Sequence, residues 1–340
     1  YSMYFAKNQN KNNYFQSLVI FTLIFFFQHS FASIINQDQY VLVKEWPNLP
    51  DNLKLGNPTG LGVDPENNIV VFHRANRAWQ QPMPKDKIQN NTILTLDKNT
   101  GNVLKSWGKD IFIMPHGLEV DSEGNFWVTD VGLHQIFKFN SKGNLEFILG
   151  EARTPGNDQF HFNLPTDVAV SNDGSFFISD GYGNSRIMKF SKKGEYLYEW
   201  GVLGSNEGEF IIPHGIDLDA LGNVYVADRE NNRIQKFDNQ GNFITSWQNT
   251  EADQLYSVAI DKNNNHLYGI DYLVVDKTVI KGSDIFRLDL NTNIQLQFGR
   301  SGMYEGPVSR YHDIVVDDVG NIYVGDILGN KVQKFLRVKK

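Results

Sequence analysis

One short unit occurs six times in the chain, and this repeat limits the possible folds more than any other sequence feature. Each unit begins with a short apolar segment, followed in most units by a turn with glycine next to asparagine or aspartate. Three more segments rich in β-branched and aromatic residues complete the unit. The apolar first segments occupy residues 58–64, 115–121, 165–170, 213–219, 256–261 and 311–317.

The spacing of the units, roughly 43–57 residues, indicates four antiparallel strands per unit rather than the helix pairs of a solenoid. We therefore predict an all-β fold, a six-bladed β-propeller that forms one domain over residues 40–336. Residues 41–46 resemble a fourth strand, whereas the last unit stops after a third strand at 331–335. The N-terminal strand is predicted to complete the last blade and so to hide both free sheet edges.

Residues 1–32 have the features of a secretory signal peptide. Lys7 and Lys11 precede a ten-residue apolar run at 18–27. We predict cleavage after Ala32 and a protein of the secretory pathway, secreted and free of the membrane after cleavage; an uncleaved signal anchor is the alternative. A sequon at Asn90 predicts a glycoprotein.

The composition limits the kinds of metal site, nucleophile and partner that the chain can have. The chain has no cysteine, which excludes disulfides, thiolate metal sites and a cysteine nucleophile. A metal would have to be bound by histidine, carboxylate or backbone oxygen. The formal net charge of −7 argues against nucleic acid as a partner.

Comparison of the six units singles out three histidines at the position that opens the inner strand. The second, fourth and sixth units have histidine there: His116, His214 and His312. The other units have Thr59, Thr166 and Ser257. Alternate blades of a closed six-bladed ring are about 120° apart, so the three imidazoles should converge on the axis. This pattern predicts a catalytic zinc with three histidine ligands and one open position, the alternative being three independent hydrogen-bonding histidines.

The end of the second strand reaches the same rim, and some units depart there from the repeat. An aspartate recurs at this place and is expected to cap the loop. The first unit has His73 instead, followed by Arg74, whereas Arg229 follows the aspartate of the fourth unit and Tyr182 lies two residues after that of the third. Arginine can bind a carboxylate through two hydrogen bonds, and a tyrosine beside cations can transfer a proton. Solvated loop charges are the alternative for the two arginines.

The units resemble NHL repeats, and several segments further resemble peptidyl-α-hydroxyglycine α-amidating lyases. The matching segments include Val71-Phe72-His73-Arg74, Pro115-His116-Gly117-Leu118, Pro165-Thr166-Asp167-Val168, Ser179-Asp180-Gly181-Tyr182 and Ala227-Asp228-Arg229-Glu230. The resemblance covers nearly all of residues 40–336. It implies an enzyme, a carbon–nitrogen lyase (peptidylamidoglycolate lyase) that splits a peptide ending in α-hydroxyglycine into a peptide amide and glyoxylate.

The resemblance also implies the site. Zinc would be bound by His116, His214 and His312. Arg74 and Tyr182 would be catalytic and, with Arg229, would bind the substrate. A structural Ca²⁺ would be held by the carbonyls of Leu61 and Leu118 and by the carboxylate of Asp313. The chain would act as a monomer, downstream of a separate copper peptidylglycine monooxygenase.

Two departures from the family pattern concern the rim. Arg310-Tyr311 stand where the family usually has Met-Pro, and Gly183 stands where a cysteine is common. Two other functions remain open. One is a non-catalytic NHL-repeat propeller that binds a protein, in which the three histidines would have no role. The other is a calcium-dependent propeller hydrolase or lactonase, whose ligands are mainly acidic residues and asparagine.

Overall fold

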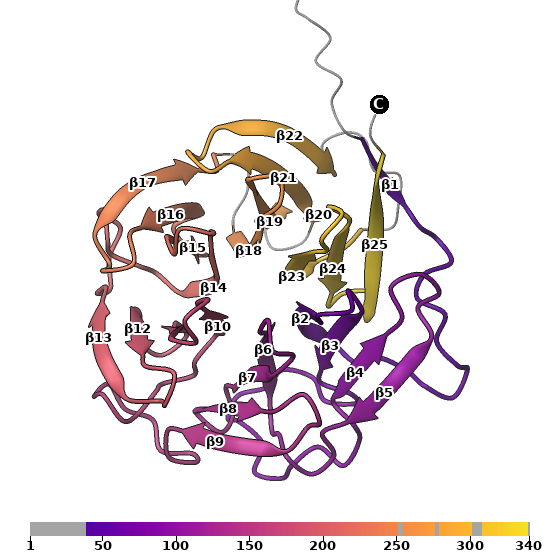
Figure 1. The fold of residues 1–340 in the computed structure, drawn as a ribbon, viewed down its shortest axis with the longest axis horizontal. Coiled ribbons are helices and arrows are strands. Elements are labelled where there is room, and N and C mark those ends of the chain that lie inside the picture. Colours follow the sequence, from indigo (N-terminus) through magenta and orange to yellow (C-terminus); the bar gives the residue numbers. More distant parts are fainter. Residues whose placement is uncertain (1–38, 251–253, 276–278, 301–307, 339–340) are drawn as a thin grey trace, which may run out of the picture. The chain divides into compact units, whose positions relative to one another are not determined.

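The computed structural model describes residues 39–250, 254–275, 279–300 and 308–338. All regular elements in these ranges are β-strands, and they form six sheets around a common centre (Figure 1). No helix long and apolar enough to cross a membrane occurs among them. The predicted six-bladed β-propeller is thus confirmed, whereas the predicted signal peptide lies outside the described residues.

Each blade runs from an inner strand outward. Blade one comprises β2 (Pro58–Val63), β3 (Ile69–His73), β4 (Ile93–Leu96) and β5 (Val103–Trp107). Blade two comprises β6 (Pro115–Val120), β7 (Phe126–Asp130), β8 (Gln135–Phe139) and β9 (Leu145–Leu149). Blade three comprises β10 (Asp167–Val170), β11 (Phe176–Asp180), β12 (Arg186–Phe190) and β13 (Tyr196–Trp200).

The second half of the ring has the same plan. Blade four comprises β14 (Pro213–Leu218), β15 (Val224–Asp228), β16 (Arg233–Phe237) and β17 (Phe243–Gln248). Blade five comprises β18 (Gln254–Asp261), β19 (His266–Val275), β21 (Asp284–Asp289) and β22 (Ile294–Gly299). Blade six comprises β23 (Tyr311–Val316), β24 (Ile322–Asp326), β25 (Lys331–Val338) and β1 (Gln39–Leu42).

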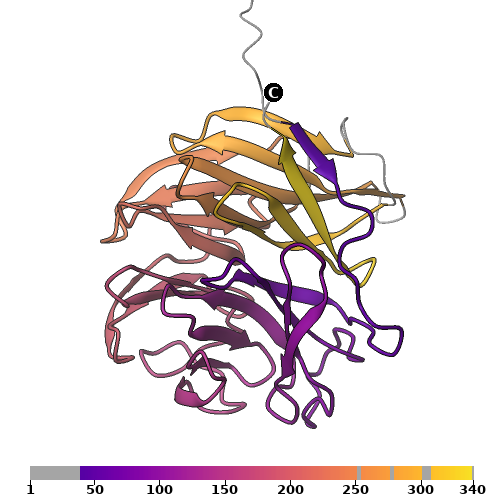
Figure 2. The same ribbon diagram turned by 45° about the vertical axis from the view of Figure 1, so that its right-hand side comes forward.

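The N-terminal strand closes the ring, as predicted, although it spans Gln39–Leu42 rather than residues 41–46. β1 pairs antiparallel with β25, with Tyr40 opposite Arg337 and Leu42 opposite Phe335 (Figure 2). The last sheet therefore has the order β1-β25-β24-β23 and combines both ends of the described chain. Because β1 covers the outer edge of β25, that strand does not present an unpaired edge.

Blade five differs from the predicted four strands. β19 is ten residues long and continues beyond the blade, where it pairs with the additional strand β20 (Val279–Gly282). This small hairpin interrupts the connection to β21, which explains why the fifth unit is longer than a simple blade needs. The repeat pattern gave no indication of it.

Burial decreases from the inner to the outer strands, and the core lies between neighbouring blades. Every residue of β7 is buried, whereas β13 alternates between half-buried and exposed residues. Between blades one and two, the Phe112 ring packs edge-on against Phe72 and Phe137, with ring centroids 4.8 and 5.4 Å apart. Inner strands buried on both faces explain why the first segment of each unit is almost continuously apolar.

Candidate metal centre and active site

The three repeat histidines meet in the centre of the ring. Their ring centroids are 4.8 Å apart for His116–His214 and for His214–His312, and 4.7 Å apart for His116–His312. One ring nitrogen from each lies within 4.8 Å of the others, and each residue is at most 3% exposed. Three equal separations are the trigonal arrangement that the repeat positions predicted.

A register shift at the start of the inner strands β6, β14 and β23 helps to bring the histidines together. In blade four, Pro213 pairs with Asp228 and Gly215 pairs with Ala227, so His214 is the extra residue between them. The same register shift leaves His312 without a ladder partner in blade six. A bulge bends the strand and re-aims the side chain of its extra residue, here toward the axis.

Hydrogen bonds to the next blade fix the orientation of each imidazole. Nδ1 lies 2.6 Å from the Thr166 carbonyl for His116, 2.8 Å from the Tyr256 carbonyl for His214, and 2.9 Å from the Thr59 carbonyl for His312. A carbonyl only accepts, so Nδ1 carries the hydrogen and Nε2 is the free ligand atom. Burial lowers the pKa of all three imidazoles well below the usual value, which keeps them neutral. This donor set fits a zinc ion with one open position.

The structure corrects the alignment of the fifth unit by one residue. The extra residue of the bulge in β18 is Tyr256, because Leu255 pairs with Asp271 and Ser257 pairs with Ile270. Tyr256, not Ser257, therefore corresponds to the histidines, and its carbonyl anchors His214. Its ring lies 5.0 Å from the His214 ring and 5.6 Å from the His312 ring, centroid to centroid. Tyr256 is thus a residue of the site that the sequence comparison missed.

Tyr182 lies directly on the histidine cluster. Its hydroxyl oxygen is 3.1 Å from Nε2 of His116 and 3.0 Å from Nε2 of His214. Since neither Nε2 carries a hydrogen, the hydroxyl can donate to either ring. Burial raises the pKa of Tyr182, and the positive charge of Arg229 opposes this shift. The structure thus brings the Tyr182 hydroxyl into contact with the histidine cluster, while its catalytic role stays a prediction.

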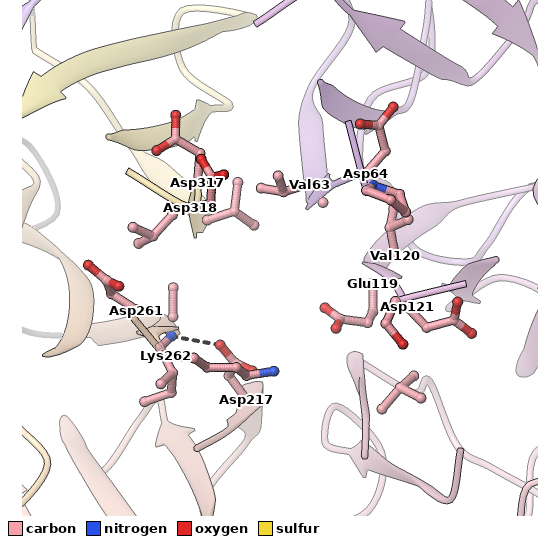
Figure 3. Close-up of a pocket in the computed structure, with 18 of the residues that line it drawn as sticks. Val63, Asp64, Glu119, Val120, Asp121, Asp217, Asp261, Lys262, Asp317 and Asp318 are labelled. Carbon is pink, nitrogen blue, oxygen red and sulfur yellow. Dashed lines mark hydrogen bonds between the residues drawn. The ribbon is translucent and has the colours of Figure 1, made fainter. Parts of the chain in front are cut away.

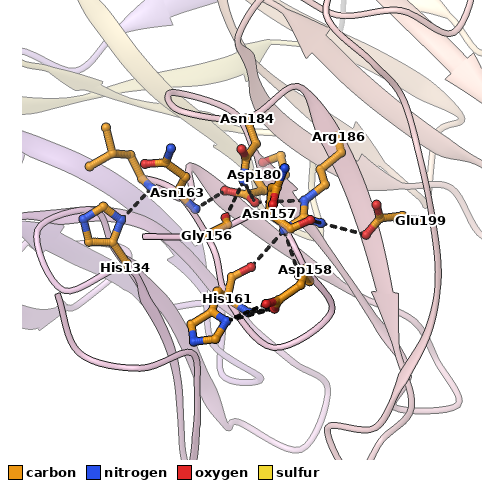
Figure 4. Close-up of polar contacts among 12 residues, drawn as sticks. His134, Gly156, Asn157, Asp158, His161, Asn163, Asp180, Asn184, Arg186 and Glu199 are labelled. Carbon is orange, nitrogen blue, oxygen red and sulfur yellow. Dashed lines mark hydrogen bonds and ion pairs between the residues drawn. The ribbon is translucent and has the colours of Figure 1, made fainter. Parts of the chain in front are cut away.

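The loop that carries Tyr182 is tied to the buried Asp180 (Figure 4). The Asp180 carboxylate accepts hydrogen bonds from Asn184 at 2.7 Å, from Arg186 at 3.1 Å and from the Asn163 backbone at 2.9 Å. This confirms the predicted capping role of the repeated aspartates. A Cβ atom on Gly181 would come within 2.0 Å of the Pro213 carbonyl, so only glycine allows this close approach.

Gly183 follows Tyr182 at the position where the resembling family often has cysteine. A Cβ atom there would lie 2.1 Å from Cγ of Asn163, so the Asn163 side chain occupies the space. The Gly183 amide also donates to the Asn163 carbonyl at 2.9 Å. In this chain, packing against Asn163 and this hydrogen bond hold the loop.

Arg74 is a buried cation with no carboxylate partner among the described residues. It is 3% exposed, its Nε donates to the Pro115 carbonyl at 3.1 Å, and its Nη2 has no hydrogen-bond partner. Its guanidinium lies 5.2 Å from the Trp79 ring centroid, and Trp79 in turn packs against Tyr182 with centroids 5.1 Å apart. Burial lowers the pKa of Arg74 to about 10, which still leaves it charged at neutral pH.

His73 stands beside Arg74 where most other units have an aspartate. It occupies the place of the repeated aspartate and caps the loop in its stead, since its Nδ1 accepts from the amides of Gly56 at 3.2 Å and Ala75 at 3.1 Å. Burial lowers the pKa of His73 to about 4, so it is neutral. Because this cap is neutral, it does not neutralise the positive charge of the adjacent Arg74.

Arg229 and Arg310 complete the rim. Arg229 forms an ion pair with Glu230 at 2.8 Å, and its Nη1 lies 3.4 Å from the Tyr182 hydroxyl. Arg310 donates from Nε to the Tyr256 hydroxyl at 3.1 Å, and its guanidinium lies 4.6 Å from the Tyr272 ring centroid. The structure therefore brings Arg74, Tyr182 and Arg229 to the histidines as predicted, and it adds Arg310 and Tyr256.

Deeper in the channel, buried carboxylates gather around Asp313. Its Oδ2 accepts from the Leu61 amide and its Oδ1 from the Ser257 hydroxyl, both at 2.7 Å. The amide and carbonyl of a strand residue point to the same side, so the Leu61 carbonyl also faces this channel. Burial raises the pKa of Asp313 to about 7, and the charge of Asp217 adds to this shift. A hard cation would stabilise such carboxylates, so the site fits Ca²⁺.

The other ends of the inner strands surround a pocket of about 480 Å³ (Figure 3). Glu119 and Asp217 line it together with Lys262. Burial raises the pKa of Glu119 to about 8. This pocket lies at the opposite end of β6 from His116, since Glu119 and Asp121 follow the histidine along the strand. It is therefore separate from the histidine rim.

Comparison with known proteins agrees with this architecture. The NHL repeat family model matches residues 112–139, 162–190 and 210–237. Among solved structures, a streptogramin B lyase superposes with a TM-score of 0.56 at 16% identity, covering 89% of this chain and 98% of that chain. At such low identity this likeness concerns the fold alone.

Two sequence relatives are more informative. Peptidyl-glycine alpha-amidating monooxygenase B of Xenopus laevis is 38% identical over 89% of this chain. The probable peptidyl-alpha-hydroxyglycine alpha-amidating lyase of Caenorhabditis elegans is 32% identical, and the match covers 82% of both chains. The chain spans about a third of the length of the vertebrate amidating monooxygenases that it matches. This degree of identity over most of the nematode protein shows that the chain belongs to the peptidyl-alpha-hydroxyglycine alpha-amidating lyase family.

Proposed function

We propose that this protein is a zinc-dependent lyase that converts peptides ending in α-hydroxyglycine into peptide amides and glyoxylate. The observation that carries the proposal is the trigonal histidine cluster with the Tyr182 hydroxyl about 3 Å from two of its Nε2 atoms. The unpartnered Nη2 of the buried Arg74 supplies a place for a carboxylate at the same rim.

Zinc held by the Nε2 atoms of His116, His214 and His312 would supply a Lewis acid for the substrate hydroxyl. Arg74 would bind the hydroxyglycine carboxylate, since guanidinium and carboxylate are complementary in shape and charge. Tyr182 would act as the base in its tyrosinate form, which Arg229 would stabilise, and would become a neutral tyrosine when it takes the hydroxyl proton.

The bond changes balance without any further reactant. The hydroxyl oxygen forms a carbonyl with the former α-carbon of the hydroxyglycine, and the bond from that carbon to the amide nitrogen breaks. The electron pair of the broken bond stays on nitrogen, which takes up the proton that the hydroxyl lost. The products are a peptide with a terminal amide and glyoxylate.

Substitution of Arg74 tests its proposed role. Arg74→Ala should lower kcat/KM about 10- to 100-fold, on the scale of a lost hydrogen bond to a charged group. Arg74→Lys should restore little, because lysine lacks the planar two-point donor. Steady-state kinetics with a hydroxyglycine peptide measures both variants, with the exposed Lys109→Ala as control. Full activity of Arg74→Ala would mean that another group binds the carboxylate.

Metal content separates this proposal from the alternatives. A lyase of the proposed type should contain about one zinc per chain, whereas calcium alone would favour a calcium-dependent hydrolase or lactonase. A chain without bound metal and without activity on α-hydroxyhippurate would favour a non-catalytic binding propeller. Elemental analysis of the purified protein and a glyoxylate assay decide among the three.

We also propose a structural Ca²⁺ at Asp313 with the carbonyls of Leu61 and Leu118. A bound ion stabilises the folded state, by about 2.7 kcal/mol when its concentration is a hundredfold above Kd. A calcium chelator, with zinc resupplied, should therefore lower the melting temperature of the wild type. Asp313→Ala should melt lower and no longer respond to the chelator. Equal shifts in both proteins would place the calcium site elsewhere.

The leader at residues 1–32 and the sequon at Asn90 support a further proposal, that the protein acts in the secretory pathway as a glycosylated, monomeric lyase. Its substrate would be supplied by a separate copper monooxygenase that hydroxylates the α-carbon of a terminal glycine. Asn90 is exposed, as a glycosylation site requires. N-terminal sequencing, glycosidase treatment and size-exclusion chromatography of secreted protein test these points.

A further inference from the structure

Arg310 is the one charged residue among the six equivalent positions at the histidine rim. The residue two positions before the central His, Thr or Tyr is apolar in three blades, where it is Met114, Leu164 or Ile212, and uncharged but polar in two, where it is Asn57 or Gln254. In blade six the corresponding place holds a charged side chain that is only half-buried. A charge that the other five units lack is not needed for the packing of a blade, so it indicates a functional role.

The Arg310 side chain is held beside the histidines by two tyrosines. Its amide donates to the Asp326 carboxylate at 2.9 Å, which fixes the backbone. Its guanidinium donates to the Tyr256 hydroxyl and stacks on the rings of Tyr256 and Tyr272, 5.3 and 4.6 Å from their centroids. Because Tyr256 packs against His214 and His312, these contacts place the charge of Arg310 next to the metal centre.

The charges at the rim do not cancel. Arg229 is paired with Glu230, whereas neither Arg74 nor Arg310 has a carboxylate partner in the described part of the chain. A hydroxyglycine substrate brings one carboxylate, which can neutralise only one of the two free arginines. A second negative group on the ligand would satisfy the other through a charge-assisted hydrogen bond.

The side chains of the two free arginines contact different aromatic rings of the rim. Arg74 lies against Trp79, on the side of Tyr182. Arg310 lies against Tyr256 and Tyr272. In hydroxyglycine the carboxylate and the amide nitrogen leave the α-carbon in different directions. A substrate whose carboxylate contacts Arg74 would therefore extend its peptide toward another part of the rim, where Arg310 can reach a neighbouring side chain.

We propose that Arg310 forms a second anion subsite, which makes the enzyme prefer hydroxyglycine peptides with an acidic side chain at the residue next to the hydroxyglycine. This inference rests on the proposed lyase function and specifies the class of peptide that the lyase would prefer. Tyr256 positions the guanidinium of Arg310 for this contact through the hydrogen bond from Nε.

The test compares two isosteric peptides that end in Glu-hydroxyglycine and Gln-hydroxyglycine. For the wild type we expect kcat/KM to be about fivefold to tenfold higher with the Glu peptide, as one charge-assisted hydrogen bond would give. In Arg310→Met this ratio should fall to about one, even if the substitution changes kcat/KM for both peptides by the same factor. Exposed Lys193→Met removes the same charge elsewhere and should keep the ratio. Equal rates with both peptides in the wild type, or an unchanged ratio in Arg310→Met, would overturn the inference.

A binding measurement separates this inference from the lyase proposal. Calorimetric titration with unreactive peptides ending in Glu-Gly and Gln-Gly reports the subsite without any turnover. We expect tighter binding of Glu-Gly by the wild type, and loss of that preference in Arg310→Met. If neither hydroxyglycine peptide is cleaved but the Glu-Gly preference persists, the lyase proposal fails and the anion subsite stands. If cleavage occurs without any preference for Glu in rate or binding, the subsite fails and the lyase proposal stands.

Discussion

His214→Ala is expected to lose the bound zinc and nearly all lyase activity. The substitution leaves two imidazoles, fewer than the three protein ligands that catalytic zinc sites use. Metal chemistry of this kind contributes several kcal/mol, so kcat should fall about 10³-fold or more. Elemental analysis and glyoxylate release measure the two effects on the same sample.

The matched control is His161→Ala. His161 lies in the loop between β9 and β10, pairs with Asp158 at 2.9 Å and is not part of the cluster (Figure 4). This variant should retain zinc and activity. A His214→Ala protein that is folded, keeps one zinc per chain and remains active would show that the histidine cluster is not the metal centre.

Tyr182→Phe is expected to keep the fold and the zinc but to lower kcat about 10²- to 10⁴-fold, the range typical of a general acid–base group. The substitution removes only the hydroxyl that lies 3.1 and 3.0 Å from two Nε2 atoms. The ring and its contacts with Trp79 and the histidines remain. KM should change less than kcat, because the lost group acts on the proton rather than on binding.

Tyr198→Phe provides a comparison for Tyr182→Phe, since Tyr198 lies on the outer strand β13 and its hydroxyl donates to the Asn239 carbonyl. This variant should have normal kinetics. Near-normal glyoxylate release by Tyr182→Phe would assign proton transfer to another group. The fold, the family and the metal site would be unaffected by that result.

The repeat pattern predicted the propeller because each blade repeats the same local physics. Inner strands are apolar because they are buried on both faces, and glycine turns with positive φ, such as Gly124 at 78° and Gly174 at 83°, recur between strands. The same repetition predicted that His116, His214 and His312 would meet. Equivalent positions in a closed ring lie at equal depth, so a pattern along the sequence becomes a pattern in space.

The residues that the sequence comparison missed depend on features without a sequence signature. A bulge adds one residue to a strand, and in β18 this places Tyr256 rather than Ser257 beside the histidines. The sequence also does not show which charged side chains form ion pairs. Only the structure shows that Arg229 is paired and Arg74 is not. The replacement of a repeated aspartate by His73 was visible, but its use of Nδ1 as a loop cap was not.

Product analysis on a single hydroxyglycine peptide tests the central proposal most directly. The purified zinc-loaded protein is incubated with the peptide, and the peptide products are identified by mass spectrometry while glyoxylate is quantified. We predict equal amounts of glyoxylate and of the peptide amide, well above the rate of spontaneous breakdown, and no such increase with the zinc-free protein. An unchanged peptide, or breakdown no faster than in buffer, would contradict the proposal that this propeller is an amidating lyase.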